Sequence, residues 1–292
     1  MQPLRPVLAL FALLAGAHAA PTLAAEAYDN CTGFIDSLPA SISTQGTWCL
    51  RKHLFTSMTS GVAITLANDN ITIDCNNFRL SGYGAGVATN AQGVAAGASR
   101  QNATIRQCRI QGFKYGVALF GAGHLVEDNR FDGNTYVGIL ANGDHHVVRR
   151  NIIHDTGGRP DEGYSTGIVA ATAPASLGIR VLDNTIDGVS PAGNGLAETF
   201  PKGIDADGVV LVQRNRIGGL VMGEHGQAIG IELDGRTIAR DNELVQNTAT
   251  EGVGIWGASD TTSICRDNDI QGYSIGIADG TCLLAGNNVV QP

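Results

Sequence analysis

The sequence predicts an all-β fold in which short strands wind into a solenoid, a single-stranded parallel β-helix of about nine coils behind an N-terminal cap. A motif of apolar residue, two residues, Asn, one residue and apolar residue recurs from about residue 70 to the end. Around each Asn, apolar and polar residues alternate, which is strand periodicity. Only 16% of the residues are charged and 39 are Gly, a composition that suits tight turns rather than disorder or long helices.

The first 25 residues are expected to be a secretory signal peptide. Arg5 precedes an apolar run over 7–17, and small residues follow at 17–19 and 23–25. A run of eleven apolar residues is too short to span a bilayer, and no later segment is long and apolar enough to do so. We therefore expect a secreted or periplasmic protein without a membrane span, cleaved after Ala19 or Ala25.

Six cysteines follow this segment, and an even number in an oxidising compartment favours three disulfides. Cys75 and Cys108 lie at or next to the Asn position of successive repeats, and Cys265 and Cys282 lie in the last two. Cys31 and Cys49 would then close a loop in an N-terminal cap over 26–60. Of the fifteen possible pairings, we predict 31–49, 75–108 and 265–282.

The repeat itself extends over 61–292. Clear copies of the motif contain Asn129, Asn151, Asn184, Asn215, Asn242 and Asn268, and looser copies contain Asn76, Cys108 and Asn287. A second strand begins at a recurring Gly-Ile or Gly-Val pair in each repeat. Such units bury their apolar faces only when they stack about 4.8 Å apart. Eight Asn would then form an inward hydrogen-bonded ladder; the alternative is that Asn only supplies surface turns.

Three early segments, 38–42, 46–50 and 71–82, resemble the first turns of bacterial right-handed parallel β-helix repeat proteins. This group includes the pectate lyases, the polygalacturonases and the NosD-like periplasmic proteins. The resemblance covers the chain from about residue 35 and implies that the parallel β-helix is right-handed. It assigns no functional residue, because the catalytic motifs of polygalacturonases, alginate epimerases and pectate lyases are missing from the sequence.

The distance from each Asn position to the next Gly-Ile or Gly-Val pair varies along the chain. It is 8, 9, 16, 19, 15, 12 and 8 residues for the repeats that start at Cys108, Asn129, Asn151, Asn184, Asn215, Asn242 and Asn268. The long loops 156–166, 189–202, 220–229 and 246–253 therefore share one corner. Long loops on a rigid scaffold often carry function, although tolerated insertion costs little entropy.

The strands that follow these loops predict an acidic site. If Ile204, Ile231 and Ile255 point inward, Asp205, Glu232 and Trp256 point outward on successive coils. The next outward pair is Asp207 and Asp234. Four clustered carboxylates favour either acid/base cleavage of a glycosidic bond or a Ca²⁺ site that assists a lyase; otherwise no cofactor is required. Trp256 would offer a ring face to a sugar. The alternative is an acidic, solvated sheet surface.

Neighbouring residues complete the predicted site. Lys202 and His225 are further catalytic candidates, and Tyr164 and Glu198 are candidates for substrate binding. His145 and His146 are poor candidates for one metal ion, since adjacent strand residues face opposite sides. The net charge of −8 and the lack of an evident basic cluster disfavour a nucleic-acid partner. We expect a polysaccharide-cleaving enzyme, lyase or hydrolase; the competing hypothesis is a non-catalytic module that binds glycan or an envelope partner.

Overall fold

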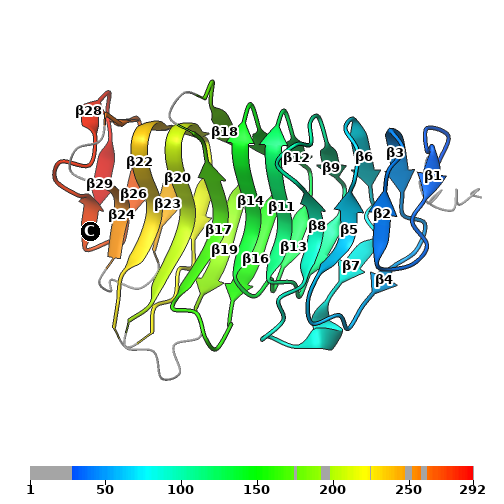
Figure 1. Ribbon diagram of the computed structural model, residues 1–292. Coiled ribbons are helices and arrows are strands. Elements are labelled where there is room, and N and C mark those ends of the chain that lie inside the picture. Colours follow the sequence, from blue (N-terminus) through cyan, green and yellow to red (C-terminus); the bar gives the residue numbers. More distant parts are fainter. Residues whose placement is uncertain are drawn as a thin grey trace, which may run out of the picture.

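The computed structural model describes residues 28–173, 176–191, 198–223, 225–246, 252–257 and 262–291. In these ranges the chain forms an elongated parallel β-helix whose strands run side by side from one end of the molecule to the other (Figure 1). The only helical element among them is the short 3-10 turn η1 (Tyr83–Ala85). The predicted all-β class and right-handed parallel β-helix are confirmed.

Each coil contributes strands to three faces. Face 1 contains β2 (Ala40–Ile42), β5 (Val62–Leu66), β8 (Gln92–Ala96), β11 (Tyr115–Ala122), β14 (Val137–Asp144), β17 (Tyr164–Ala171), the first parts of β20 (Phe200–Gln213) and β22 (Ala228–Arg240), β24 (Gly252–Gly257) and β27 (Ile275–Ile277). Because β20 and β22 continue round the corner, their second parts belong to face 2.

Face 2 also contains β3 (Gly46–Cys49), β6 (Ile71–Asp74), β9 (Thr104–Arg106), β12 (Leu125–Glu127), β15 (Val147–Arg149), β18 (Ile179–Leu182), β25 (Ile264–Arg266) and β28 (Leu283–Ala285), with β1 (Gly33–Phe34) added on β3. Face 3 contains β4 (Leu54–Phe55), β7 (Arg79–Ser81), β10 (Arg109–Gln111), β13 (Arg130–Asp132), β16 (Ile152–Gly157), β19 (Thr185–Ser190), β21 (Arg216–Gly218), β23 (Glu243–Val245), β26 (Asp269–Gln271) and β29 (Val289–Gln291).

The ten strands of face 3 correspond to ten coils in the described part of the chain, where the sequence predicted about nine. The additional coil lies within the predicted cap, because β2, β3 and β4 pair with β5, β6 and β7. Its strands are short and lack the Asn motif, so the pattern that identifies the later coils does not detect it. Stacking of coils therefore starts at residue 40, inside the 26–60 range.

The interior is filled by like residues stacked on like. On face 1, Ile139, Ile168, Ile204, Ile231 and Ile255 are fully buried and occupy the same position in successive coils. The large rings Phe113 and Phe131 fill the core of the earlier coils. The short strands of faces 2 and 3 alternate buried and more exposed residues with the predicted period of two, for example β12, β15 and β23.

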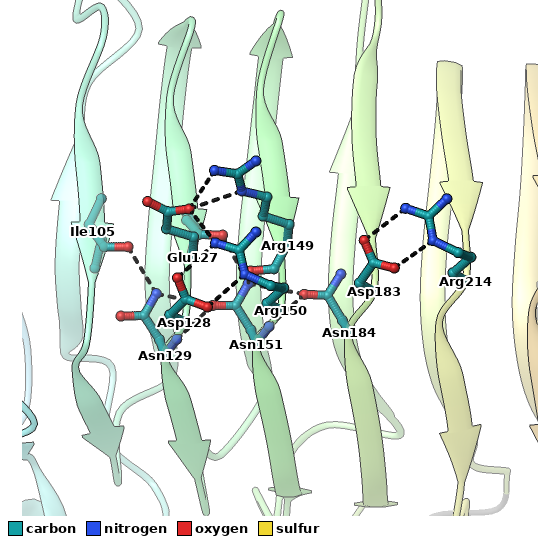
Figure 2. Close-up of polar contacts among 11 residues, drawn as sticks. Ile105, Glu127, Asp128, Asn129, Arg149, Arg150, Asn151, Asp183, Asn184 and Arg214 are labelled. Atoms are coloured by element: carbon teal, nitrogen blue, oxygen red, sulfur yellow. Dashed lines mark hydrogen bonds and ion pairs between the residues drawn. The ribbon is translucent and has the colours of Figure 1, made fainter.

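An Asn ladder runs through the corner between faces 2 and 3 (Figure 2). The Nδ2 of Asn151 donates to Val126 O on the preceding coil and to Asn184 Oδ1 on the next, which also accepts from the Asn151 backbone N–H. The described ladder consists of Asn129, Asn151, Asn184, Asn215, Asn242, Asn268 and Asn288. The inward ladder is therefore present, but its last member is Asn288 rather than Asn287.

Asn76 is also outside the ladder, because Cys75 and Cys108 occupy this corner at the N-terminal end. The Cys108 backbone N–H donates to Asn129 Oδ1, so the disulfide between these cysteines continues the column of Asn. The two other predicted disulfides, 31–49 and 265–282, are also present. Three disulfides fit a protein of an oxidising compartment. In the described ranges no helix has the length and apolar character needed to cross a membrane.

Candidate functional site

The predicted register on face 1 is present in the structure. Asp205 pairs with Glu232, Asp207 pairs with Asp234, and Glu232 pairs with Trp256 on the following coil. These side chains face outward, because the intervening residues of the same strands are buried in the core. Strand pairing therefore brings Asp205, Glu232 and Trp256 into one row across three coils.

Lys202 joins this row through an irregularity that recurs at the Gly-Ile or Gly-Val pair of neighbouring face 1 strands. A Cβ on Gly203 would lie 2.5 Å from Ile217 Cγ2, a core atom, so Gly203 faces the interior as Ile204 does. With two successive residues facing inward, Lys202 and Asp205 both face outward although they are three positions apart. The Lys202 Nζ lies 3.0 Å from Asp205 Oδ2 and also contacts Glu232 Oε2. One ammonium group thus bridges carboxylates on adjacent coils.

The bridge is largely buried, and this changes the ionisation of its members. Burial raises the pKa of Glu232 above its usual value; the hydrogen bond from Lys202 opposes the rise and the charge of Asp205 adds to it. Burial lowers the pKa of Lys202, but the two carboxylates more than offset this, so its pKa is raised. Lys202 therefore remains a cation, and Glu232 takes up a proton more readily than an ordinary glutamate does.

Asp207 and Asp234 lie apart from this bridge, on the exposed side of face 1. Burial raises the pKa of Asp207, and the charges of Asp234 and Asp205 raise it further. A cavity of about 460 Å³ adjoins Asp207 at the corner with face 2. In the described ranges no three His, Cys, Asp or Glu side chains are placed to hold a metal ion. The expected Ca²⁺ site of four carboxylates therefore gains no support from this geometry.

Aromatic side chains border the bridge on the side of the long loops. Tyr164 stacks on Phe200 with ring centroids 5.3 Å apart, and both open strands that lead into the site. Two coils earlier, Tyr115 and Tyr136 meet edge to face at 5.6 Å. The charges of Lys202 and Asp205 act on the pKa of Tyr136, which burial chiefly raises. Tyr136 belongs to this neighbourhood, although no sequence motif singled it out.

Two loops contact each other beside these tyrosines. Arg159 in the first long loop is buried, and its guanidinium donates at 2.5 Å to Thr89 O in the loop that follows η1. Lys114 lies 5.1 Å from the ring centre of Tyr136 and 3.5 Å from Glu162 Oε1. The loop between faces 3 and 1 at residue 159 therefore reaches across two coils to the one at residue 89.

Two predicted participants do not join the bridge. His225 is exposed, and its backbone carbonyl, not its ring, accepts bonds from Thr199. Glu198 is also exposed, with no side-chain hydrogen bond to a described residue. Their loop positions were predicted from length alone, which does not set side-chain direction. Parts of the long loops, at 192–197, 224 and 247–251, lie outside the described residues.

The stacked coils, the Asn ladder and the outward carboxylates define a right-handed parallel β-helix protein with a bridged acidic site on one face. Residues 40–199 match the family model described as right handed beta helix region. The chain belongs to this family. A search of curated proteins finds no match, and neither does a search of solved structures.

Proposed function

We propose that this chain is a secreted or periplasmic β-helix that cleaves polysaccharide at the row formed by Lys202, Asp205, Glu232 and Trp256. The observation that supports the proposal is the bridge itself, in which two outward carboxylates on adjacent coils share one ammonium group. Purely solvating acidic residues on a sheet surface would not need a buried cation between them.

In this mechanism the two carboxylates have different tasks. Glu232, with its raised pKa, is the general acid that protonates the glycosidic oxygen. The carboxylate of Asp205 stabilises positive charge at the anomeric carbon or activates water. Lys202 holds both in place, and when Glu232 is protonated the ammonium is left paired with Asp205. Trp256, on the next coil, and the Tyr164–Phe200 stack offer ring faces to sugar units on either side.

The test is a panel of neutral and uronate polysaccharides incubated with the wild type and with Glu232→Gln, with and without a chelator. We expect new reducing ends from the wild type and a loss of at least 100-fold in the variant, since general acid catalysis contributes roughly 10²–10⁴-fold. Glu243→Gln is the matched control, because Glu243 is a half-exposed glutamate on face 3 whose one ion pair among the described residues is with Arg216 at 3.6 Å. Activity should fall as the pH rises through the pKa of Glu232.

Two outcomes would change the assignment. Unsaturated products, lost on adding chelator, would replace hydrolysis by metal-assisted lysis. No product from any polysaccharide, together with glycan binding that Glu232→Gln retains, would contradict catalysis and favour a binding module, in which Lys202 simply neutralises Asp205 and Glu232.

A further inference from the structure

Three arginines stand in one row on the outer side of face 3. Arg109 pairs in register with Arg79 on one side and with Arg130 on the other. Their neighbours Leu80, Ile110 and Phe131 are fully buried, so the arginine side chains point outward. Like charges directly opposite each other on paired strands, roughly 4.8 Å apart, repel and cost stability. This basic row escapes inspection of the sequence, because its members are separated by about one coil.

The ionic environment of this row differs from that of face 2. On and beside face 2, Arg149 and Arg150 bind Glu127 and Asp128, and Arg214 binds Asp183 at 2.6 Å (Figure 2). In the row on face 3, Arg130 is neutralised by Asp132 at 2.7 Å. Arg79 and Arg109 form no ion pair and no side-chain hydrogen bond with any described residue. Two unneutralised guanidinium groups therefore lie side by side in a chain of net charge −8.

A cavity of about 530 Å³ opens beside Arg79, a volume within the range of small-ligand sites. Its lining residues come from β4 and the segment after it, from β7, from the η1 turn and from β10. The lining includes two aromatic rings, three aliphatic hydroxyl groups and one amide, which are groups that can contact a sugar: Phe55, Tyr83, Thr56, Ser57, Ser81 and Gln111.

The two aromatic residues of this cavity are held in place although they are exposed. Phe55 is 64% exposed, and its ring meets that of His53 at 6.4 Å. Tyr83 is 53% exposed, and its hydroxyl donates to Asp132 O at 3.3 Å. A Cβ on Gly112 would lie 2.6 Å from the Tyr83 ring, so glycine at that position lets the ring lie against the backbone. Each ring therefore has exposed surface on which the apolar face of a sugar can rest.

We propose that this basic row and cavity form a second binding site, for an acidic glycan whose units extend along the helix axis. A carboxylate of one unit would bind Arg79 and that of a neighbouring unit would bind Arg109, each through paired N–H donors. A sugar ring of the same chain would rest on Phe55 or Tyr83. This site lies on a different face from the Lys202 bridge and does not depend on catalysis there.

The test measures binding of a uronate tetrasaccharide by calorimetry to the full chain carrying Arg79→Gln and Arg109→Gln. Loss of two charge-assisted contacts should weaken binding roughly tenfold or more. The matched control is Arg150→Gln with Arg214→Gln, which removes the same net charge from face 2 and should change affinity less than threefold. Arg79→Lys with Arg109→Lys keeps the charge but loses the paired donors, and should recover only part of the affinity.

Three results would overturn the proposal: equal weakening in the face 2 control, equal affinity for a neutral tetrasaccharide, or equal affinity for a single-stranded oligonucleotide. Thermal melting of each variant checks that it is folded. Cleavage of a short substrate should persist in the Arg79 and Arg109 variant, and glycan binding should persist in Glu232→Gln. Failure of the second site and failure of the proposed catalysis therefore give different results.

Discussion

At the scale of single residues, the Asn ladder requires one particular side chain at each of its positions. Asn184 accepts from both the backbone N–H and the Nδ2 of Asn151, and it donates to Val148 O. The residue before each ladder Asn from Asn129 to Asn268 has a positive φ, for example 56° at Asp183 and 52° at Arg214. The turn therefore points backbone donors at the side chain of the next Asn, and no shorter or apolar side chain could satisfy them.

Replacing Asn184 by Ala should lower the free energy of unfolding by about 2–4 kcal/mol, because it leaves the Asn151 N–H and the Val148 carbonyl buried without partners. Denaturant unfolding measures the change. Asn142→Ala is the control: Asn142 is exposed at the end of β14, and a change within about 0.5 kcal/mol is expected there. An equal decrease in the free energy of unfolding in both variants would show that a ladder Asn contributes no more to stability than an exposed Asn does.

A second column of polar side chains, made of two histidines, predicts a dependence on pH. His124 and His146 are buried and stacked with ring centroids 4.8 Å apart. The Nδ1 of His124 accepts from Ala103 N–H, and the Nδ1 of His146 accepts from His124 N–H. Nδ1 of both rings must therefore be unprotonated, so that both rings are neutral. His145, by contrast, is half exposed, as the alternation along the strand predicted.

Burial, together with the charge of neighbouring His124, lowers the pKa of His146 to about 4, and burial also lowers the pKa of His124. When folding lowers the pKa of a histidine, the unfolded chain binds the proton at a higher pH than the folded chain does. Stability should therefore be lost as the pH falls from about 6.5 towards about 4, by on the order of 3 kcal/mol for His146. Thermal melts across this range measure it. His146→Gln should flatten the dependence, whereas exposed His225→Gln should leave it unchanged.

At the scale of strands, the sequence predicted the register of the site but not all its members. The spacing from Asn to the Gly-Ile pair placed Asp205 beside Glu232, because parallel coils keep equivalent residues in line. Strict alternation places Lys202 on the inward side once Gly203 is taken as outward. In the structure Gly203 and Ile204 both face inward, as the equivalent Gly and Ile do in the neighbouring coils, and this brings the Lys202 ammonium to both carboxylates. An irregularity of one residue is invisible to a period-two pattern.

The same limit applies to the loops and to the basic row. Four long loops at one corner could be read from spacing, but the bond from Arg159 to Thr89 could not, since the register over 82–99 is not fixed by any repeat. Arg109 and Arg130 follow the repeat positions Cys108 and Asn129 in the sequence. The corresponding positions in the next two coils, however, are Ile152 and Thr185. A motif shared by only part of the coils becomes apparent when the strands are paired.

At the scale of the molecule, the two ends of the solenoid are finished differently. β1 adds a strand to the first coil and is tied there by the disulfide 31–49. In the last coil, the residues equivalent to core positions are open to solvent: Leu284 is 68% exposed and Val290 is 48% exposed. A coil in a solenoid is stabilised by its neighbours, and the last described coil has a described neighbour on one side only.

The disulfide 265–282 should therefore hold the last coil in place more than it holds the whole fold together. It closes a loop of 17 residues, for which chain entropy gives roughly 3 kcal/mol. In Cys265→Ser with Cys282→Ser, amide exchange should accelerate over 275–291 while β11, β14 and β17 keep their protection.

The control is Cys31→Ser with Cys49→Ser, which opens a loop of nearly equal length, 18 residues, at the other end and should accelerate exchange only near β1 and β3. Faster exchange throughout the chain in the first variant would show that the coils unfold as one cooperative unit, and that the last coil is not independently held.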